Sequence, residues 1–215
     1  MCWNKEVSLN TFLFSGFVLL LIIYNNKYTK YKTLELDNLW IFLFLATIIL
    51  VQLDEYFIWK YIKNSYYNIF YTIIIQLIFF IQPVISLMIL NNKNLRNLLI
   101  CIYLIVMIPF ATYIFFTKRM YTEVSPKGHL NYINHLNKYP IIFFFWVCLF
   151  LFSFFYNRTY QGFLFGLITF LVIFYNYQQD KSVASMWCWI VNTSMFYYAA
   201  RLLFYLPFLE TQNLC

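Results

Sequence analysis

The stretch Val51-Gln52-Leu53-Asp54-Glu55-Tyr56-Phe57-Ile58-Trp59 places two adjacent carboxylates inside a run that otherwise has the composition of a membrane-spanning helix. An ionisable side chain at the centre of such a helix costs about 2.5 to 3.5 kcal/mol on insertion scales, so it is usually retained for a function. Asp54 and Glu55 are the only acidic residues inside any apolar segment of the chain. They are therefore the starting point for predicting a site.

The overall composition predicts a membrane protein. The 215 residues are 63% hydrophobic and only 11% charged, whereas a water-soluble domain carries about 25% charged residues. The net charge of +7 sits in short loops between apolar runs. That placement is typical of topology signals and contact with lipid headgroups, so we expect no nucleic-acid partner.

Seven apolar runs approach or exceed the length of about 20 residues that a helix needs to cross a bilayer. They predict an all-α, polytopic integral membrane protein, a seven-transmembrane-helix bundle that forms one domain over residues 1–215 without a soluble domain. The fifth and sixth runs are short, which leaves six or eight spans open. Cys101 and Cys148 fall within apolar runs and are predicted to be small buried side chains. The runs cover residues 9–26, 38–60, 68–90, 95–116, 140–156, 160–176 and 184–206.

An odd number of crossings would bring the N-terminus, the acidic stretch and the start of the last span to one side of the membrane. We call this side end A and the opposite side end B. Basic residues are nearly balanced between the two ends. Lysines that follow the first run favour end B as the cytoplasmic side.

Helix geometry separates the two carboxylates. Gln52, Glu55 and Trp59 share one helix face, whereas Asp54 points about 100° away. Glu55 would lie about 7 Å from the end of its helix at end A. Two interpretations follow: a ligand pocket centred on Glu55, with Asp54 at its edge, or shallow carboxylates that are hydrated or paired with a nearby lysine.

Further candidate ligand-binding residues lie along the third and last spans. Asn68 opens the third span, and Ser185 and Trp187 open the last. Gln82 directly precedes Pro83, so its amide is expected either to satisfy the carbonyl that proline frees or to contact a solute. The tryptophans of this end also fit an interfacial aromatic belt.

Cysteine and histidine spacing predicts no metal site and no cofactor. Cys2 and Cys188 are expected at the same end, as a disulfide or as two thiols. His129 and His135 lie in the connection between the fourth and fifth spans, six residues apart. That spacing does not place them on one helix face.

Four short motifs occur together in this chain: the opening Met1-Cys2-Trp3, Gln52-x-x-Glu55-x-x-x-Trp59, Gln82-Pro83 and Ser185-x-Trp187-Cys188. Together they resemble an uncharacterised seven-span family of large DNA viruses and bacteria. Members of that family open Met-Cys-Trp or Met-Cys-Phe, usually followed by Ser-Ala, where this chain has Asn4-Lys5. The resemblance would cover most of the chain and implies no known reaction. It implies a viral or bacterial source and, with it, a viral or host internal membrane.

The sequence predicts a non-enzymatic protein that binds or transports a small polar or cationic solute, or a lipid headgroup, at a pocket around Glu55. Its expected partners are the lipid bilayer and such a ligand, and a homo-oligomer is left open. One alternative is a structural component of a viral or organellar membrane. Another is a membrane-embedded enzyme that modifies lipid or acyl groups, with Cys2 or Cys188 as nucleophile and His129 or His135 as base.

Overall fold

The computed structural model describes residues 4–133 and 136–208. Within these residues, five helices are long and apolar enough to cross a membrane, which confirms the prediction of an all-α protein with several such helices. A shorter apolar helix and a final, interrupted helical stretch complete the bundle. The five long helices are α1 (Lys5–Tyr28), α2 (Leu39–Lys60), α3 (Ser65–Met88), α4 (Lys93–Thr117) and α6 (Tyr160–Tyr177).

The remaining elements are short. They are the helix α5 (Pro140–Tyr156), the consecutive helices α7 (Val183–Asn192) and α8 (Ser194–Ala200), the π-helical turn η3 (Arg201–Tyr205), the 3-10 turns η1 (Leu34–Leu36) and η2 (Leu136–Lys138), and the strands β1 (Tyr121–Val124) and β2 (Leu130–Ile133).

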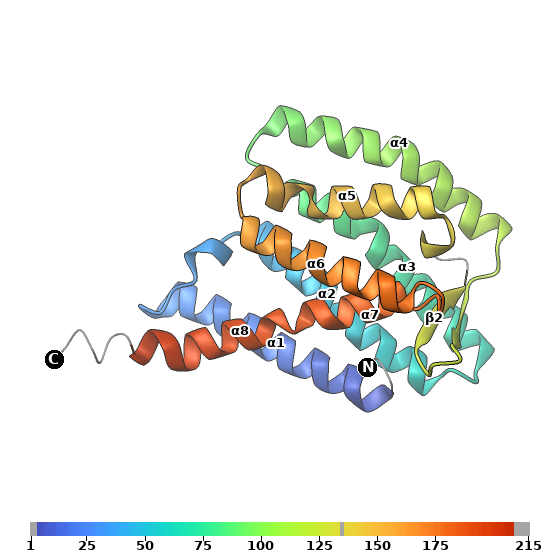
Figure 1. The fold of residues 1–215 in the computed structure, drawn as a ribbon, viewed down its shortest axis with the longest axis horizontal. Coiled ribbons are helices and arrows are strands. Elements are labelled where there is room, and N and C mark those ends of the chain that lie inside the picture. Colours follow the sequence, from blue (N-terminus) through green and yellow to red (C-terminus); the bar gives the residue numbers. More distant parts are fainter. Residues whose placement is uncertain (1–3, 134–135, 209–215) are drawn as a thin grey trace.

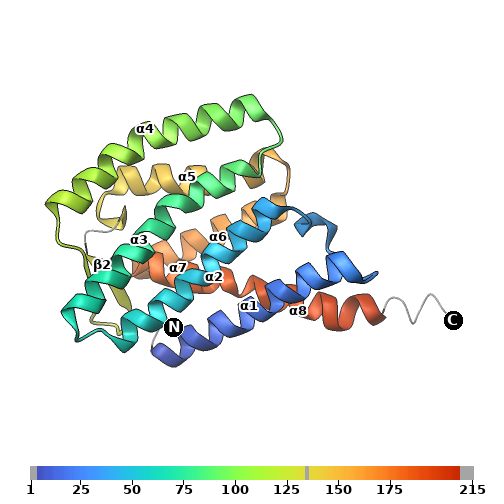
Figure 2. The same ribbon diagram turned by 180° about the vertical axis from the view of Figure 1, so that it is seen from behind.

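The helices run back and forth between two ends of the molecule (Figure 1). The start of α1, the end of α2 and the start of α7 lie at the end that carries the β-hairpin, as an odd number of crossings predicts. This end is therefore end A. The last described residues lie at the opposite end, and the view from behind shows the same arrangement (Figure 2).

The outer surface of the bundle is apolar. Large hydrophobic side chains on different helices are almost fully exposed, for example Phe116 at 87%, Ile141 at 83% and Tyr175 at 81%. A water-soluble protein rarely exposes apolar patches of this extent. The surface and the long apolar helices together indicate an integral membrane protein.

The prediction that Cys101 and Cys148 are buried is wrong, because both are exposed on the outer surface. An apolar residue in a membrane span can face lipid as readily as it faces the protein interior. Hydropathy alone does not distinguish the two environments.

Trp146 of α5 is a buried member of the larger core cluster, which joins α2 to α7 and strand β2. Its Nε1 donates to the carbonyl of Phe79 on α3 at 2.6 Å. Pro83 has no N–H to offer that carbonyl, which a regular helix would bond at the i−4 position. The expectation that Gln82 satisfies the freed carbonyl is therefore wrong, and Trp146 has this role.

The connection between α4 and α5 forms an antiparallel hairpin, which the sequence analysis did not predict. Thr122 of β1 pairs with Tyr132 of β2. Ser125-Pro126-Lys127-Gly128 makes the turn, and the Gly128 N–H donates to the Ser125 carbonyl at 2.9 Å. Gly128 has φ +81°, which glycine adopts without steric cost.

Asn68 fixes this hairpin to α3. Its Nδ2 donates to the Thr122 carbonyl at 2.9 Å, and its Oδ1 accepts from the Thr122 N–H at 2.8 Å. The hydroxyls of Thr72 and Thr122 lie 2.7 Å apart. The side-chain amide of Asn68 thus bonds both backbone groups of Thr122, as a residue of a neighbouring strand would.

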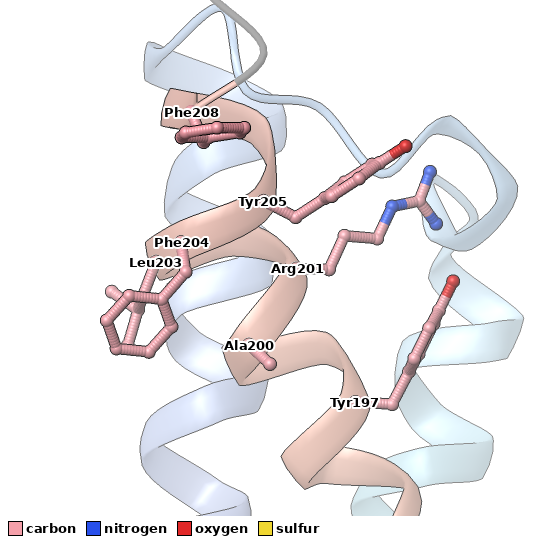
Figure 3. Close-up of a pocket in the computed structure, with 7 residues that line it drawn as sticks. All are labelled: Tyr197, Ala200, Arg201, Leu203, Phe204, Tyr205 and Phe208. Atoms are coloured by element: carbon pink, nitrogen blue, oxygen red, sulfur yellow. The ribbon is translucent and has the colours of Figure 1, made fainter.

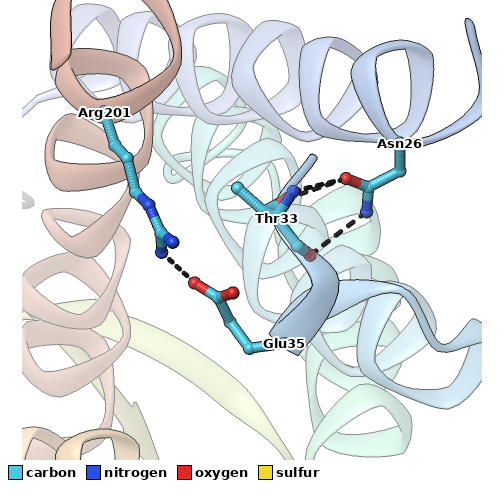
Figure 4. Close-up of polar contacts among 4 residues, drawn as sticks. All are labelled: Asn26, Thr33, Glu35 and Arg201. Atoms are coloured by element: carbon cyan, nitrogen blue, oxygen red, sulfur yellow. Dashed lines mark hydrogen bonds and ion pairs between the residues drawn. The ribbon is translucent and has the colours of Figure 1, made fainter. Parts of the chain in front are cut away.

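Polar contacts at end B hold the connection between α1 and α2 (Figure 4). Asn26 accepts from the Thr33 N–H at 2.7 Å and donates to the Thr33 carbonyl at 3.3 Å. Arg201 of η3 forms an ion pair with Glu35 of η1. The final helical stretch is therefore attached to the first connection.

Candidate functional site

Glu55 lies on the last turns of α2 and is completely buried. Gln52, one turn earlier, donates from Nε2 to Glu55 Oε2 at 3.0 Å. The Tyr132 hydroxyl, from strand β2, donates to Glu55 Oε1. The carboxylate is therefore held by one donor from its own helix and one from the hairpin.

Residues of α3 and α7 complete the surroundings of Glu55. The rings of Tyr132 and Phe79 have centroids 6.2 Å apart. Cys188 of α7 is buried in the neighbourhood of Glu55. Ser185, one turn before Cys188, is also completely buried. Four elements, α2, β2, α3 and α7, thus meet at this point.

Asp54 points away from this cluster, as helix geometry predicts. It lies next to Ile75 and Tyr71 of α3, and its Oδ2 has no hydrogen-bond partner among residues 4–133 and 136–208. Asp54 is 5% exposed and Glu55 is fully buried. The interpretation of both as shallow, hydrated carboxylates is therefore wrong, because α3 covers Asp54 and the hairpin covers Glu55.

Three other predicted site residues are engaged in other contacts. Asn68 is committed to the backbone of the hairpin, as described above. Trp187 is 2% exposed and its Nε1 donates to Thr169 at 3.2 Å, so it belongs to the core and not to an aromatic belt. Trp59 is only partly buried and contacts the larger core cluster.

Gln82 lies deeper in the bundle, on a polar stripe that runs along one face of α3. Its side chain is 1% exposed, and neither Nε2 nor Oε1 has a hydrogen-bond partner in the described part of the chain. One turn further on, the Ser86 hydroxyl donates to the Phe150 carbonyl at 2.7 Å and lies 2.8 Å from the Ser153 hydroxyl. Gln82 thus has unused hydrogen-bonding capacity within the described residues.

A serine, a histidine and an aspartate meet at the tip of the hairpin. The Ser125 hydroxyl donates to Asp180 Oδ2 at 2.7 Å, and the backbone N–H of His129 donates to the Ser125 hydroxyl at 3.1 Å. The His129 ring packs against Tyr177, with centroids 5.2 Å apart. Burial lowers the pKa of His129, and the negative charge of Asp180 opposes that shift.

This arrangement is not a catalytic triad. In a triad the nucleophile donates to an imidazole, which the carboxylate orients, whereas Ser125 donates to Asp180 directly. Within the described ranges no three His, Cys, Asp or Glu side chains are grouped to hold a metal ion. Cys2 and His135 lie outside the described residues, so the pairing of Cys2 with Cys188 stays a prediction.

A groove on the surface of end B is built from the final helical stretch alone (Figure 3). Its volume is about 790 Å³. The guanidinium of Arg201 is engaged by Glu35, as described above. The lining residues are Tyr197, Ala200, Arg201, Leu203, Phe204, Tyr205 and Phe208.

Tyr132 is the site residue that sequence reasoning missed. Two signals were present: the turn sequence Pro126-Lys127-Gly128, and the alternation that buries Leu130 and Tyr132 on one face of β2. Both predict a hairpin with a buried face. Neither predicts that the tyrosine reaches Glu55.

Comparison with known proteins finds no matching family model, curated protein or solved structure. The resemblance to a seven-span family of large DNA viruses and bacteria therefore stays a prediction.

Proposed function

We propose that this chain is a seven-span membrane protein that binds a small polar or cationic solute at Glu55, with the β-hairpin as the cover of the site. Two elements beyond the five long helices supply the additional crossings. The 17 residues of α5 extend about 25 Å, close to the thickness of the hydrocarbon core. The stretch from α7 through η3 returns from end A to end B.

The observation that carries the proposal is the complete burial of Glu55. A carboxylate in such a place is expensive and is usually retained for a function. Gln52 and Tyr132 both donate to the carboxylate, so these two contacts fix its orientation. Carboxyl oxygens oriented inside an apolar bundle offer acceptors to a cation or to the donor groups of a polar solute.

The hairpin controls access to Glu55 from end A. Tyr132 lies directly on the carboxylate, and β1 is held through Asn68 and Thr72. A solute from this side reaches Glu55 only when Tyr132 moves. Opening of the hairpin is therefore the proposed step that admits the solute.

The test compares Glu55→Gln with Asp54→Asn, a matched loss of one buried carboxylate on the same helix. Purified protein is studied in detergent by thermal unfolding and in liposomes by flux, with protons, Na⁺, K⁺ and choline as probes. A probe at 100 times its Kd stabilises the folded protein by about 2.7 kcal/mol. We expect Glu55→Gln to abolish both responses and Asp54→Asn to reduce them less.

Equal effects of the two substitutions on both readouts would contradict a site at Glu55. If no probe changes the unfolding temperature or crosses the bilayer, and Glu55→Gln assembles normally, the result favours a structural component of a membrane.

A further inference from the structure

A second groove lies at end A, between the hairpin and the helices α5, α6 and α7. Its volume is about 400 Å³. Strand β2 forms one side through Asn131 and Tyr132. The groove is distinct from the Glu55 cluster, although Tyr132 belongs to both.

The rim of this groove is polar and positively charged. Lys138 and Lys181 both line it, together with Asn131 and Gln178, and the described lining includes no acidic side chain. Two ammonium groups at one rim attract an anion, and the two amides offer further hydrogen bonds.

The backbone at this rim is fixed in an uncommon conformation. Lys181 has φ +56°, in the left-handed region that a non-glycine residue rarely adopts. The turn is held by the bond from the Lys181 N–H to the Gln178 carbonyl at 3.2 Å. Its neighbour Asp180 is bonded to Ser125 and Ser182. These bonds fix the backbone position from which the Lys181 side chain extends.

Below the rim the groove becomes apolar. Phe143 and Phe144 at the start of α5, Phe174 near the end of α6 and Val183 at the start of α7 form its wall. Phe144 is 57% exposed, so the wall continues onto the lipid-facing surface of α5. The groove therefore changes from cationic to apolar in the direction from the membrane surface toward the bilayer interior.

We propose that this groove binds an anionic phospholipid from the leaflet at end A. The phosphate lies between Lys138 and Lys181, and the upper acyl chain lies along Phe143 and Phe144. A soluble anion would use the two lysines but not the apolar wall.

The test measures lipid retention. Full-length protein is purified from vesicles of phosphatidylcholine with one fifth phosphatidylglycerol, and the retained lipids are counted by native mass spectrometry. We expect enrichment of phosphatidylglycerol over the bulk ratio, with affinity about 30-fold lower in the Lys138→Gln/Lys181→Gln double variant, from about 1 kcal/mol per basic residue. The matched control, Lys27→Gln/Lys93→Gln at end B, should leave the enrichment unchanged.

Lys138→Arg/Lys181→Arg should keep the enrichment, which separates loss of charge from misfolding. Equal enrichment in the wild type and the Lys→Gln pair at end A would overturn the proposal. So would displacement of the lipid by millimolar inorganic phosphate, which would identify a free anion as the ligand. Glu55→Gln should retain the lipid, so the outcome is independent of the function proposed above.

Discussion

The bond from Tyr132 to Glu55 predicts a large effect for the loss of one hydroxyl group. Tyr132→Phe keeps the ring beside Phe79 and removes only the donor to the carboxylate. A hydrogen bond to a charged group contributes about 1.5 to 3 kcal/mol. Tyr132 is 2% exposed and Glu55 is completely buried, so little water is present to replace the lost donor. We therefore expect a loss of about 2 kcal/mol.

For a chain of this length the loss corresponds to a fall of about 4 to 8 °C in the unfolding temperature. Thermal unfolding in detergent, followed by far-ultraviolet circular dichroism, measures it. The control is Tyr66→Phe, because Tyr66 is 74% exposed at the same end of the molecule, and it should leave the temperature unchanged. A double-mutant cycle with Glu55→Gln should give a coupling energy of about 1.5 to 3 kcal/mol. A cycle without coupling would refute the contact and the role of the hairpin as a cover.

Three further predictions concern other buried polar groups. Trp146→Phe should lower the free energy of unfolding by about 1 to 3 kcal/mol, because the Phe79 carbonyl loses its donor, and by less in a Pro83→Ala background, where a helix N–H returns. Gln82→Leu should raise the free energy of unfolding by about 1 to 3 kcal/mol, because it removes an amide whose Nε2 and Oε1 have no partner among residues 4–133 and 136–208. Burial lowers the pKa of His129, so the neutral imidazole favours the folded state. This contribution to stability is present above about pH 6.5 and is lost as the pH falls through the folded-state pKa. Acid should therefore destabilise the wild type more than the His129→Gln variant.

Thermal unfolding measures all three effects, the last between about pH 7.5 and about pH 5. Equal losses for Trp146→Phe with and without Pro83 would show that the indole only fills space. Destabilisation by Gln82→Leu would show that its amide has a structural partner. Parallel pH profiles for the wild type and His129→Gln would exclude protonation of this histidine as a cause.

The helices could be predicted because hydropathy reports burial in lipid directly. The predicted run 38–60 and the helix Leu39–Lys60 nearly coincide. The last span, predicted as one helix over 184–206, is instead interrupted after Asn192. There Thr193 donates to the Ile190 carbonyl at 2.5 Å and Ser194 to the Val191 carbonyl at 2.8 Å. Such bonds compete with the backbone ladder and bend helices, an effect that hydropathy does not detect.

The candidate site could be predicted only where its members are local. Gln52 and Glu55 lie three residues apart, so helix geometry alone places them together. Tyr132 is 77 residues from Glu55 and reaches it only because the hairpin folds over the end of α2. Asn68 was expected to bind a ligand because it is polar and near the same end. Its actual partner is the backbone of Thr122, a long-range pairing that no local pattern specifies.

The separation of 77 residues between Glu55 and Tyr132 also dictates an order of biosynthesis. Glu55 is synthesised first, and Tyr132 follows only after α3, α4 and β1 have been made. During that interval the carboxylate of Glu55 lacks the hydrogen bond from Tyr132. Because Glu55 lies in the final turns of α2, we expect water to solvate its carboxylate until the hairpin closes.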